Sequence, residues 1–284
     1  MSKTWFITGS ASGIGAAVAK AALAAGDNVV ATDRDTERLE RAFTEQGEKL
    51  LRATLDITDE PQAVAAVRAA VAHFGRIDVL VNNAGYGQFG PFEENDAPAI
   101  EKQFATNVFG TFHVTRAVLP VLRRQRAGHV FILSSLGGFT GVPNASIYTS
   151  TKFALEGFSE SLVFEVAEFG IKVTLVEPGA FRTDFLNGDV LRYGTRTIDD
   201  YASFTAAARA TVEKRNGREL GDPTKLAEAL ILLAGLQNPP LHFVAGPDAF
   251  DKMTTKLKTM SDEVAAWRDL SLSTDFEHSI PRRS

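Results

Sequence analysis

Tyr148 and Lys152 are the residues of this chain whose types and spacing best suit acid–base chemistry. Side chains four residues apart lie on the same face of a helix. An ammonium group within a few ångströms of a phenol favours the phenolate and lowers the pKa of the phenol from about 10. Such a tyrosine can take or give a proton near neutral pH. The alternative interpretation is a solvated helix face on which this spacing arises by chance.

A glycine-rich segment near the N-terminus predicts a nucleotide-binding turn. Residues 4–8 are apolar, residues 9–15 read GSASGIG, and a second apolar run at 28–32 leads to Asp33. Strand, glycine turn, helix and strand form a βαβ unit, whose helix N-terminus can bind a pyrophosphate. Asp33 stands about where an acid that binds a ribose hydroxyl is expected. No lysine follows the glycines, which excludes a P-loop, and a purely structural glycine turn is the alternative.

Strands and helices alternate along most of the chain. We expect further strands at 50–55, 79–81, 129–133, 172–177 and 241–244, and helices at 36–46, 58–74, 97–126, 147–169, 205–214, 224–236 and 248–270. Apolar strands without polar alternation are typical of a parallel sheet that helices cover on both faces. Ligands bind at the carboxyl edge of such a sheet, and six notable residues each follow a strand: Gly9, Asp33, Asp56, Asn83, Ser135 and Gly179.

The sequence indicates one domain over residues 1–284, because no Gly/Ser/Pro-rich linker interrupts residues 1–180. Residues 180–220 contain several Gly and Asp residues and are predicted to form loops with short helices, which suits a substrate lid. Residues 247–284 are predicted to form an extra C-terminal helix followed by a loosely ordered tail.

The composition and charge of the chain argue against nucleic-acid binding and against a membrane-spanning protein. A net charge of −5 leaves no basic field for nucleic acid, and the cluster Arg123, Arg124 and Arg126 suits the end of a helix. The longest apolar run, at 229–236, is too short to span a membrane. A strand that begins by Thr4 leaves no room for a signal peptide, so we expect a cytoplasmic protein.

Disulfides and metal sites are not expected either. The chain has no cysteine, which excludes thiolate chemistry and fits a reducing compartment. Its five histidines are scattered, with neither HxxxH nor a local His–carboxylate spacing, and we therefore predict no metal site.

Taken together, these motifs resemble the short-chain dehydrogenase/reductase family. They are TGxxxGxG from Thr8 to Gly15, NNAG from Asn82 to Gly85, Asn107 within NVxG, Ser135, Tyr148, Lys152, and Pro178-Gly179. Their order and spacing match the family, and within it the chain most resembles bacterial oxidoreductases similar to 17β-hydroxysteroid and retinol dehydrogenases. The resemblance implies an α/β fold: one Rossmann-like, doubly wound parallel sheet of order 3-2-1-4-5-6-7, flanked by helices on both faces.

The resemblance also implies catalytic roles. Tyr148 would be the acid/base, and Lys152 would lower its pKa and bind the nicotinamide ribose. Ser135 would donate to the substrate oxygen, and Asn107 would hold a water molecule for proton relay. Each has a simpler interpretation: Ser135 could cap the end of a strand, and Asn107 could satisfy helix backbone groups.

The cofactor implied by the resemblance is a nicotinamide dinucleotide. Asp56 with Ile57 would contact the adenine, and Thr183 the carboxamide. Asp33 favours NAD because its carboxylate repels a 2′-phosphate, whereas Arg34 could pair with one, which leaves NADP open. The cofactor-binding residues implied are Gly9, Ser12, Gly13, Ile14, Gly15, Asp33, Arg34, Asp56, Ile57, Asn83, Ala84, Gly85, Tyr148, Lys152, Pro178, Gly179 and Thr183.

The activity implied is an NAD(P)-dependent oxidoreductase that acts on a CH–OH group and interconverts a secondary alcohol with a ketone or aldehyde. The alternatives are a catalytically silent NAD(P)-binding regulator and an epimerase or dehydratase, although the latter resemble a different glycine pattern, TGxxGxxG. The expected partners are an apolar small-molecule substrate and further copies of the chain, in a homodimer or homotetramer formed through the helices near 97–126 and 147–169. Aromatic residues that could line an apolar pocket, or simply pack, are Phe89, Phe92, Phe139, Phe181, Phe185 and Tyr193.

Overall fold

A central parallel sheet organises the computed structural model, which describes residues 2–44, 47–188 and 190–276. Its seven strands are β1 (Thr4–Thr8), β2 (Asn28–Asp33), β3 (Leu50–Thr54), β4 (Val79–Asn82), β6 (Gly128–Leu133), β7 (Ile171–Pro178) and β9 (His242–Ala245). The spatial order is β3-β2-β1-β4-β6-β7-β9, and every neighbouring pair is parallel. This confirms the predicted strand order, because β5 and β8 belong to a second, smaller sheet.

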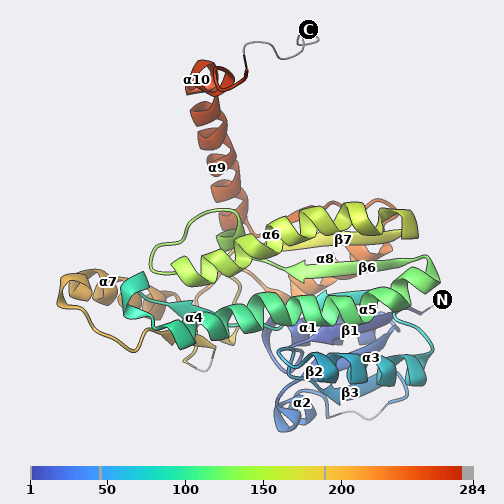
Figure 1. Ribbon diagram of the computed structural model, residues 1–284. Coiled ribbons are helices and arrows are strands. Elements are labelled where there is room, and N and C mark those ends of the chain that lie inside the picture. The colour runs from blue at the N-terminus through green and yellow to red at the C-terminus, as the bar shows by residue number, and fades with distance from the viewer. Residues whose placement is uncertain (1, 45–46, 189, 277–284) are drawn as a thin grey trace.

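Helices cover both faces of the sheet, as predicted (Figure 1). One face carries α3 (Glu60–Phe74), α5 (Thr111–Gln125) and α6 (Ser146–Val166), and the other α1 (Gly13–Ala24), α2 (Thr36–Ala42) and α8 (Pro223–Gly235). Successive residues of β1 alternate between the two cores: Trp5 and Ile7 pack in one and Phe6 in the other. Both faces are therefore apolar, which is why the strands lack polar alternation.

Some helix limits differ from the prediction. The cap of α3 is Asp59 rather than Thr58, since the Asp59 carboxylate accepts a hydrogen bond from the backbone N–H of Gln62. The helix predicted over 36–46 ends at Ala42, and residues 45–46 lie outside the described residues.

The long helix predicted over 97–126 is interrupted. It consists of α4 (Ala97–Phe104), a π-helical turn η2 (Ala105–Gly110) and α5. At Gly110 a Cβ atom would lie 2.6 Å from Ile57, so glycine lets this turn pack directly against the segment between β3 and α3. Single π turns are frequent at functional sites, and this one carries Asn107.

The segment predicted as a lid contains a strand that the sequence did not reveal. β8 (Leu191–Tyr193) pairs in parallel with β5 (Gly87–Phe89), another unpredicted strand. Each has only three residues, too few for a periodic pattern. This pairing places β8 beside the segment that follows β4, and hydrogen bonds from Ile198 and Thr205 to Glu94 hold the start of α7 (Ala202–Arg215) there as well.

The C-terminal helix is divided into α9 (Pro247–Ala266) and α10 (Arg268–Leu272), whereas one helix over 248–270 was predicted. Figure 1 shows α9 rising away from the sheet and its covering helices. Only Ala249 and Met253 of α9 are buried. Among the described helices, none has the length and apolar character needed to cross a membrane.

Candidate active site

The turn between β1 and α1 has the form of a phosphate-binding loop. Gly9 and Gly13 adopt φ angles of 63° and 57°, in the region that favours glycine. A Cβ atom on Gly15 would lie 2.4 Å from the carbonyl oxygen of Gly9, so only glycine lets α1 begin this close to β1. Ser12 is the N-cap residue of α1 without a side-chain cap, and Ile14 lies in the first helical turn. Amides at such a helix start are suited to bind a pyrophosphate.

The NNAG segment is bonded directly to this turn. The Asn83 side chain donates to the carbonyl oxygens of Thr8 and Gly9, at 2.9 and 3.0 Å. The Thr8 hydroxyl oxygen accepts from the amides of Asn83 and Ala84, both at 3.0 Å. These bonds fix the ends of β1 and β4 relative to one another, and Gly85 continues the segment toward Asn107.

The predicted ribose-binding acid also lies at the turn. Asp33 accepts hydrogen bonds from the backbone amides of Ala11, at 3.4 Å, and Asp35, at 3.1 Å. An open surface pocket adjoins it, lined by Arg34, Asp35, Thr36, Glu37, Thr54, Asp56 and Gln62. The side chain of Ile57, by contrast, is buried in the core, so only the backbone of this residue could make the predicted contact with the adenine.

The last predicted cofactor residues follow β7. Pro178 ends β7, and the amide of Gly179 donates to the carbonyl oxygen of Ala245. Thr183 lies against the glycine turn, since a Cβ atom built on Gly13 would be 3.5 Å from the Cβ of Thr183. The structure therefore brings Thr183 to the same edge of the sheet as the N-terminal glycines.

Tyr148 and Lys152 are both buried on α6. The Lys152 Nζ lies 5.7 Å from the centroid of the Tyr148 ring and donates to the carbonyl oxygen of Leu133, at 2.7 Å. Ser135 follows β6, and its side chain accepts from the amide of Gly137. Its hydroxyl lies beside the Tyr148 ring, since a Cβ atom built on Gly137 would be 3.5 Å from the one and 3.4 Å from the other. Phenol, hydroxyl and ammonium thus lie together at the carboxyl edge of the sheet.

Burial controls the protonation of this pair. It raises the pKa of Tyr148 to about 12, against the lowering effect of the Ser135 hydrogen bond. It lowers the pKa of Lys152 to about 8, against the raising effect of Glu156. In the protein alone the pKa of Tyr148 therefore lies above its ordinary value, because desolvation of the phenolate dominates, and the lowering effect of Lys152 stays a prediction.

The Asn107 side chain forms hydrogen bonds with protein groups through both its oxygen and its nitrogen. Its oxygen accepts from the amide of Tyr86, at 3.1 Å, and its nitrogen donates to the Tyr86 carbonyl and the Thr151 hydroxyl, at 3.0 and 3.2 Å. These contacts tie the segment after NNAG to α6. The side chain thus links the π turn to α6 and to the segment after β4, and its predicted binding of a water molecule stays a prediction.

Aromatic rings flank the phenol. The rings of Phe89, on β5, and Phe185, after β7, lie 5.8 and 5.7 Å from the Tyr148 ring, centroid to centroid. Of the other predicted lining residues, Phe92 is exposed, Phe181 packs against a core cluster, and Tyr193 contacts Arg209. Phe89 from β5 and Phe185 from the turn after β7 therefore form an apolar wall beside Tyr148.

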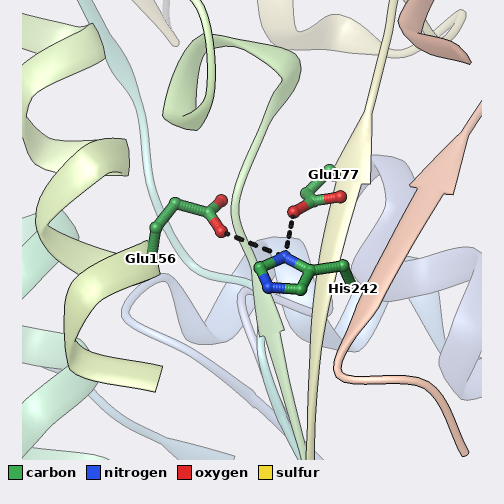
Figure 2. A group of neighbouring side chains, drawn as sticks. All are labelled: Glu156, Glu177 and His242. Carbon is green, nitrogen blue, oxygen red and sulfur yellow. Dashed lines mark hydrogen bonds and ion pairs between the residues drawn. The ribbon is translucent and has the colours of Figure 1, made fainter. Parts of the chain in front are cut away.

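A second group of titratable residues, missed by the sequence analysis, lies one helical turn beyond Lys152 (Figure 2). The His242 Nδ1 is 2.8 Å from Glu177 and 3.8 Å from Glu156. Ser134 also donates to Glu156, whose pKa burial raises to about 7. The residues come from α6, β7 and β9, so no local spacing could reveal them. Their ligand atoms lie within 4.8 Å of one another, and the absence of a metal site stays a prediction.

Comparison with known proteins agrees with this geometry. The short chain dehydrogenase family model matches residues 3–191. Oxidoreductase BOA17 of Botryotinia fuckeliana is 41% identical over 274 residues, or 96% of this chain and 99% of that protein. A short-chain dehydrogenase structure from Streptomyces avermitilis has a TM-score of 0.87 at 39% identity, covering 97% of this chain and 100% of that one.

A third relative carries a cofactor. The 3-ketoacyl-(acyl-carrier-protein) reductase of Brucella melitensis, complexed with NADH, has a TM-score of 0.71 at 29% identity, covering 85% of this chain and 96% of that one. This chain therefore belongs to the short-chain dehydrogenase/reductase family. It is an oxidoreductase with a Rossmann-like fold.

Proposed function

We propose that this protein interconverts a secondary alcohol with a ketone or aldehyde by hydride transfer to or from NAD(P), with Tyr148 as the acid/base. The observation that carries the proposal is the burial of Tyr148 between the Ser135 hydroxyl and two phenylalanine rings, with Lys152 one turn further along α6. The glycine turn and Asp33 end at the same edge of the sheet.

The side chains suit the charge that this reaction develops. Nicotinamide supplies or accepts the hydride when the cofactor is bound. In reduction, negative charge grows on the substrate oxygen, where the hydroxyls of Ser135 and Tyr148 donate hydrogen bonds. Tyr148 then gives its proton to that oxygen. The buried ammonium of Lys152, held by the Leu133 carbonyl, stabilises the phenolate that remains.

The pKa of Tyr148, about 12, keeps the phenol protonated near neutral pH. That is the form needed to donate a proton to a carbonyl oxygen, and the ground state therefore suits reduction. The rings of Phe89 and Phe185 favour an apolar carbonyl compound over a highly charged one.

Replacing the phenol tests the mechanism. Tyr148→Phe is expected to lower kcat by about 10³-fold, within the range of general acid catalysis, while NADH binding by fluorescence stays unchanged. Ser150→Ala is the control, since it removes an exposed hydroxyl from the same helix, one that donates to the Ser146 carbonyl. Retained turnover in Tyr148→Phe would exclude Tyr148 as the acid/base.

The alternative functions are separable by assay. A regulatory protein would bind NADH without converting any member of a panel of ketones, aldehydes and secondary alcohols followed at the nicotinamide absorbance. An epimerase or dehydratase would convert its substrate without net change in that absorbance. The complete set of Ser135, Tyr148 and Lys152 favours the dehydrogenase.

Asp33 supports NAD as the preferred form of the cofactor. Its carboxylate lies at the glycine turn, where it can accept from a ribose 2′-hydroxyl and would repel a 2′-phosphate. We expect a higher kcat/KM with NAD(H) than with NADP(H), measured on the same substrate. The reverse preference would show that Arg34 dominates the recognition of this end of the cofactor.

The remaining assignments are also proposals. We propose a single domain in which residues 180–220 act as the substrate lid, and a cytoplasmic location. A homodimer or homotetramer through α5 and α6 is supported by the phenylalanines that these helices and the preceding π turn expose: Phe109, Phe153 and Phe164. Light scattering of purified protein measures that state.

A further inference from the structure

We infer that α9 is a self-association helix that pairs in antiparallel fashion with α9 of a second copy of this chain. The large apolar residues of α9 follow an alternating spacing of three and four, at Phe250, Met253, Leu257, Met260 and Val264, and Trp267 directly after the helix continues it. This repeat averages 3.5 residues, which is the seam of a two-stranded coiled coil and narrower than the stripe of a helix that covers a globular core.

Most of this seam is uncovered in the single chain. Met253, near the base of the helix, is buried, but Met260 is 45% exposed, Leu257 54%, Trp267 65% and Val264 72%. Scattered exposed apolar residues are ordinary, whereas a continuous row of them along a protruding helix marks an interaction surface. A helix of this length that stands alone in water is only marginally stable, and a partner helix would stabilise it.

Charges beside the seam select a second copy as the partner. Lys256 and Glu263 flank the seam on the same side, one heptad apart, and neither forms an ion pair within the described residues. When Leu257 packs beside Met260 of the partner subunit in an antiparallel pair, Lys256 faces Glu263 of the partner subunit. Twofold symmetry makes this contact twice, as an isologous interface requires. The other flank carries the uncharged Thr254 and Ser261.

The shape of the molecule also favours the antiparallel arrangement. In Figure 1 the rest of the chain extends to both sides of the base of α9. Packed helices lie about 8–10 Å apart, so a parallel pair would force the two bodies into the same space. An antiparallel pair of 20-residue helices separates the bodies by about 30 Å along the helix axis. In a parallel pair the corresponding ion pair would join Glu263 to Arg268 of the partner subunit. Arg268 lies beyond the end of α9 at Ala266, so the helix pair would not position it.

The first test removes the seam in the full-length protein. We expect Leu257→Glu combined with Val264→Glu to weaken association by at least about 100-fold, since buried charges oppose apolar packing. Sedimentation equilibrium at micromolar concentration would then give half the wild-type molar mass, whether or not a second interface through α5 and α6 is present. Leu232→Glu, an exposed site on α8, is the control that keeps the wild-type mass. Far-UV circular dichroism verifies that each variant is folded.

Charge reversal tests the orientation. Lys256→Glu and Glu263→Lys should each weaken association by about fivefold to tenfold, and the double reversal should restore it. An unchanged mass in the seam variant, including the case of a monomeric wild type, would overturn the inference. A double-reversal variant that associates as weakly as the single-reversal variants would also overturn the inference. These readouts do not depend on turnover, so failure of the proposed chemistry would leave them unaffected.

Discussion

The sheet edge that carries the glycine turn and the segment after β7 are built in different ways. At the edge, buried polar groups bond to one another: Thr8 to Asn83 and Ala84, and Asn107 to Tyr86 and Thr151. After β7, α8 and β9 rejoin the central fold, whereas α7 has no buried residue and α9 has two. The sheet edge is therefore a rigid frame for the proposed catalytic groups, whereas α7 and α9 are attached through few buried residues.

This contrast assigns different tasks to the two regions. Catalytic side chains need fixed geometry, so they lie on elements that both cores hold in place. Substrate shape and subunit contacts vary between related enzymes, and loosely attached segments can change without disturbing the frame. We therefore expect substitutions at the sheet edge to alter binding of the cofactor and turnover, and substitutions in the loops and helix between β7 and α8, or on α9, to alter substrate affinity or association.

The largest effect is expected at the glycine turn. Gly15→Ala would place a Cβ atom 2.4 Å from both the Gly9 carbonyl oxygen and the Asn83 side chain, so the turn must shift. We predict at least about 100-fold weaker NADH binding by fluorescence titration, because the pyrophosphate site moves with it. Near-normal binding would show that the turn adapts and that the frame is less rigid than its contacts indicate.

The matched control is a glycine on α6. No atom lies within 4 Å of a Cβ built on Gly157, and the residue is within a regular helix. Gly157→Ala should therefore raise the free energy of unfolding by about 0.5–1 kcal/mol, measured in urea, with NADH binding unchanged.

A smaller effect is expected after β7. Phe185→Ala removes one ring from the wall beside Tyr148. We expect KM to rise about tenfold with a smaller change in kcat, and stability to fall by less than about 1 kcal/mol. Phe92→Ala is the control, since this ring is 64% exposed. An equal loss in kcat and kcat/KM would instead place Phe185 in the catalytic frame.

The smallest effect concerns pH. The pKa of Glu156 is about 7 in the folded chain, above its usual 4.5, so the folded state holds a proton that the unfolded state releases. The stabilisation is complete below pH 4.5 and is lost as pH rises through 7. Between pH 5 and pH 8, wild type should lose about 1 kcal/mol or more relative to Glu156→Gln in urea unfolding. Parallel pH profiles would contradict this, and the exposed Glu160→Gln is the control.

The family resemblance supplied the strand order, whereas local signals in the sequence placed Gly9, Asp33 and Ser135 at one edge of the sheet. Apolar runs bounded by turn residues indicate buried strands, and parallel strands share a carboxyl edge. Tyr148 and Lys152 share a helix, so their spacing alone placed them together.

What the sequence missed depends on contacts between distant segments. The three-residue strands β5 and β8 form because the segment after β7 pairs with the segment after β4, and no local sequence pattern records this pairing. His242 joins Glu156 and Glu177 only through the order of the strands. The raised pKa of Tyr148 arises from burial by Phe89, Phe185 and their neighbours, which a spacing cannot measure.

The central claim is that Tyr148 and Lys152 face a nicotinamide ring whose pyrophosphate lies on the turn from Gly9 to Gly15. A crystal structure of the full-length protein with NAD⁺ tests it most directly. We predict the ring beside the Tyr148 hydroxyl, its ribose within hydrogen-bonding distance of the Lys152 Nζ, and the adenosine near Asp33. A ring bound elsewhere, or a Tyr148 hydroxyl directed away from it, would contradict the account.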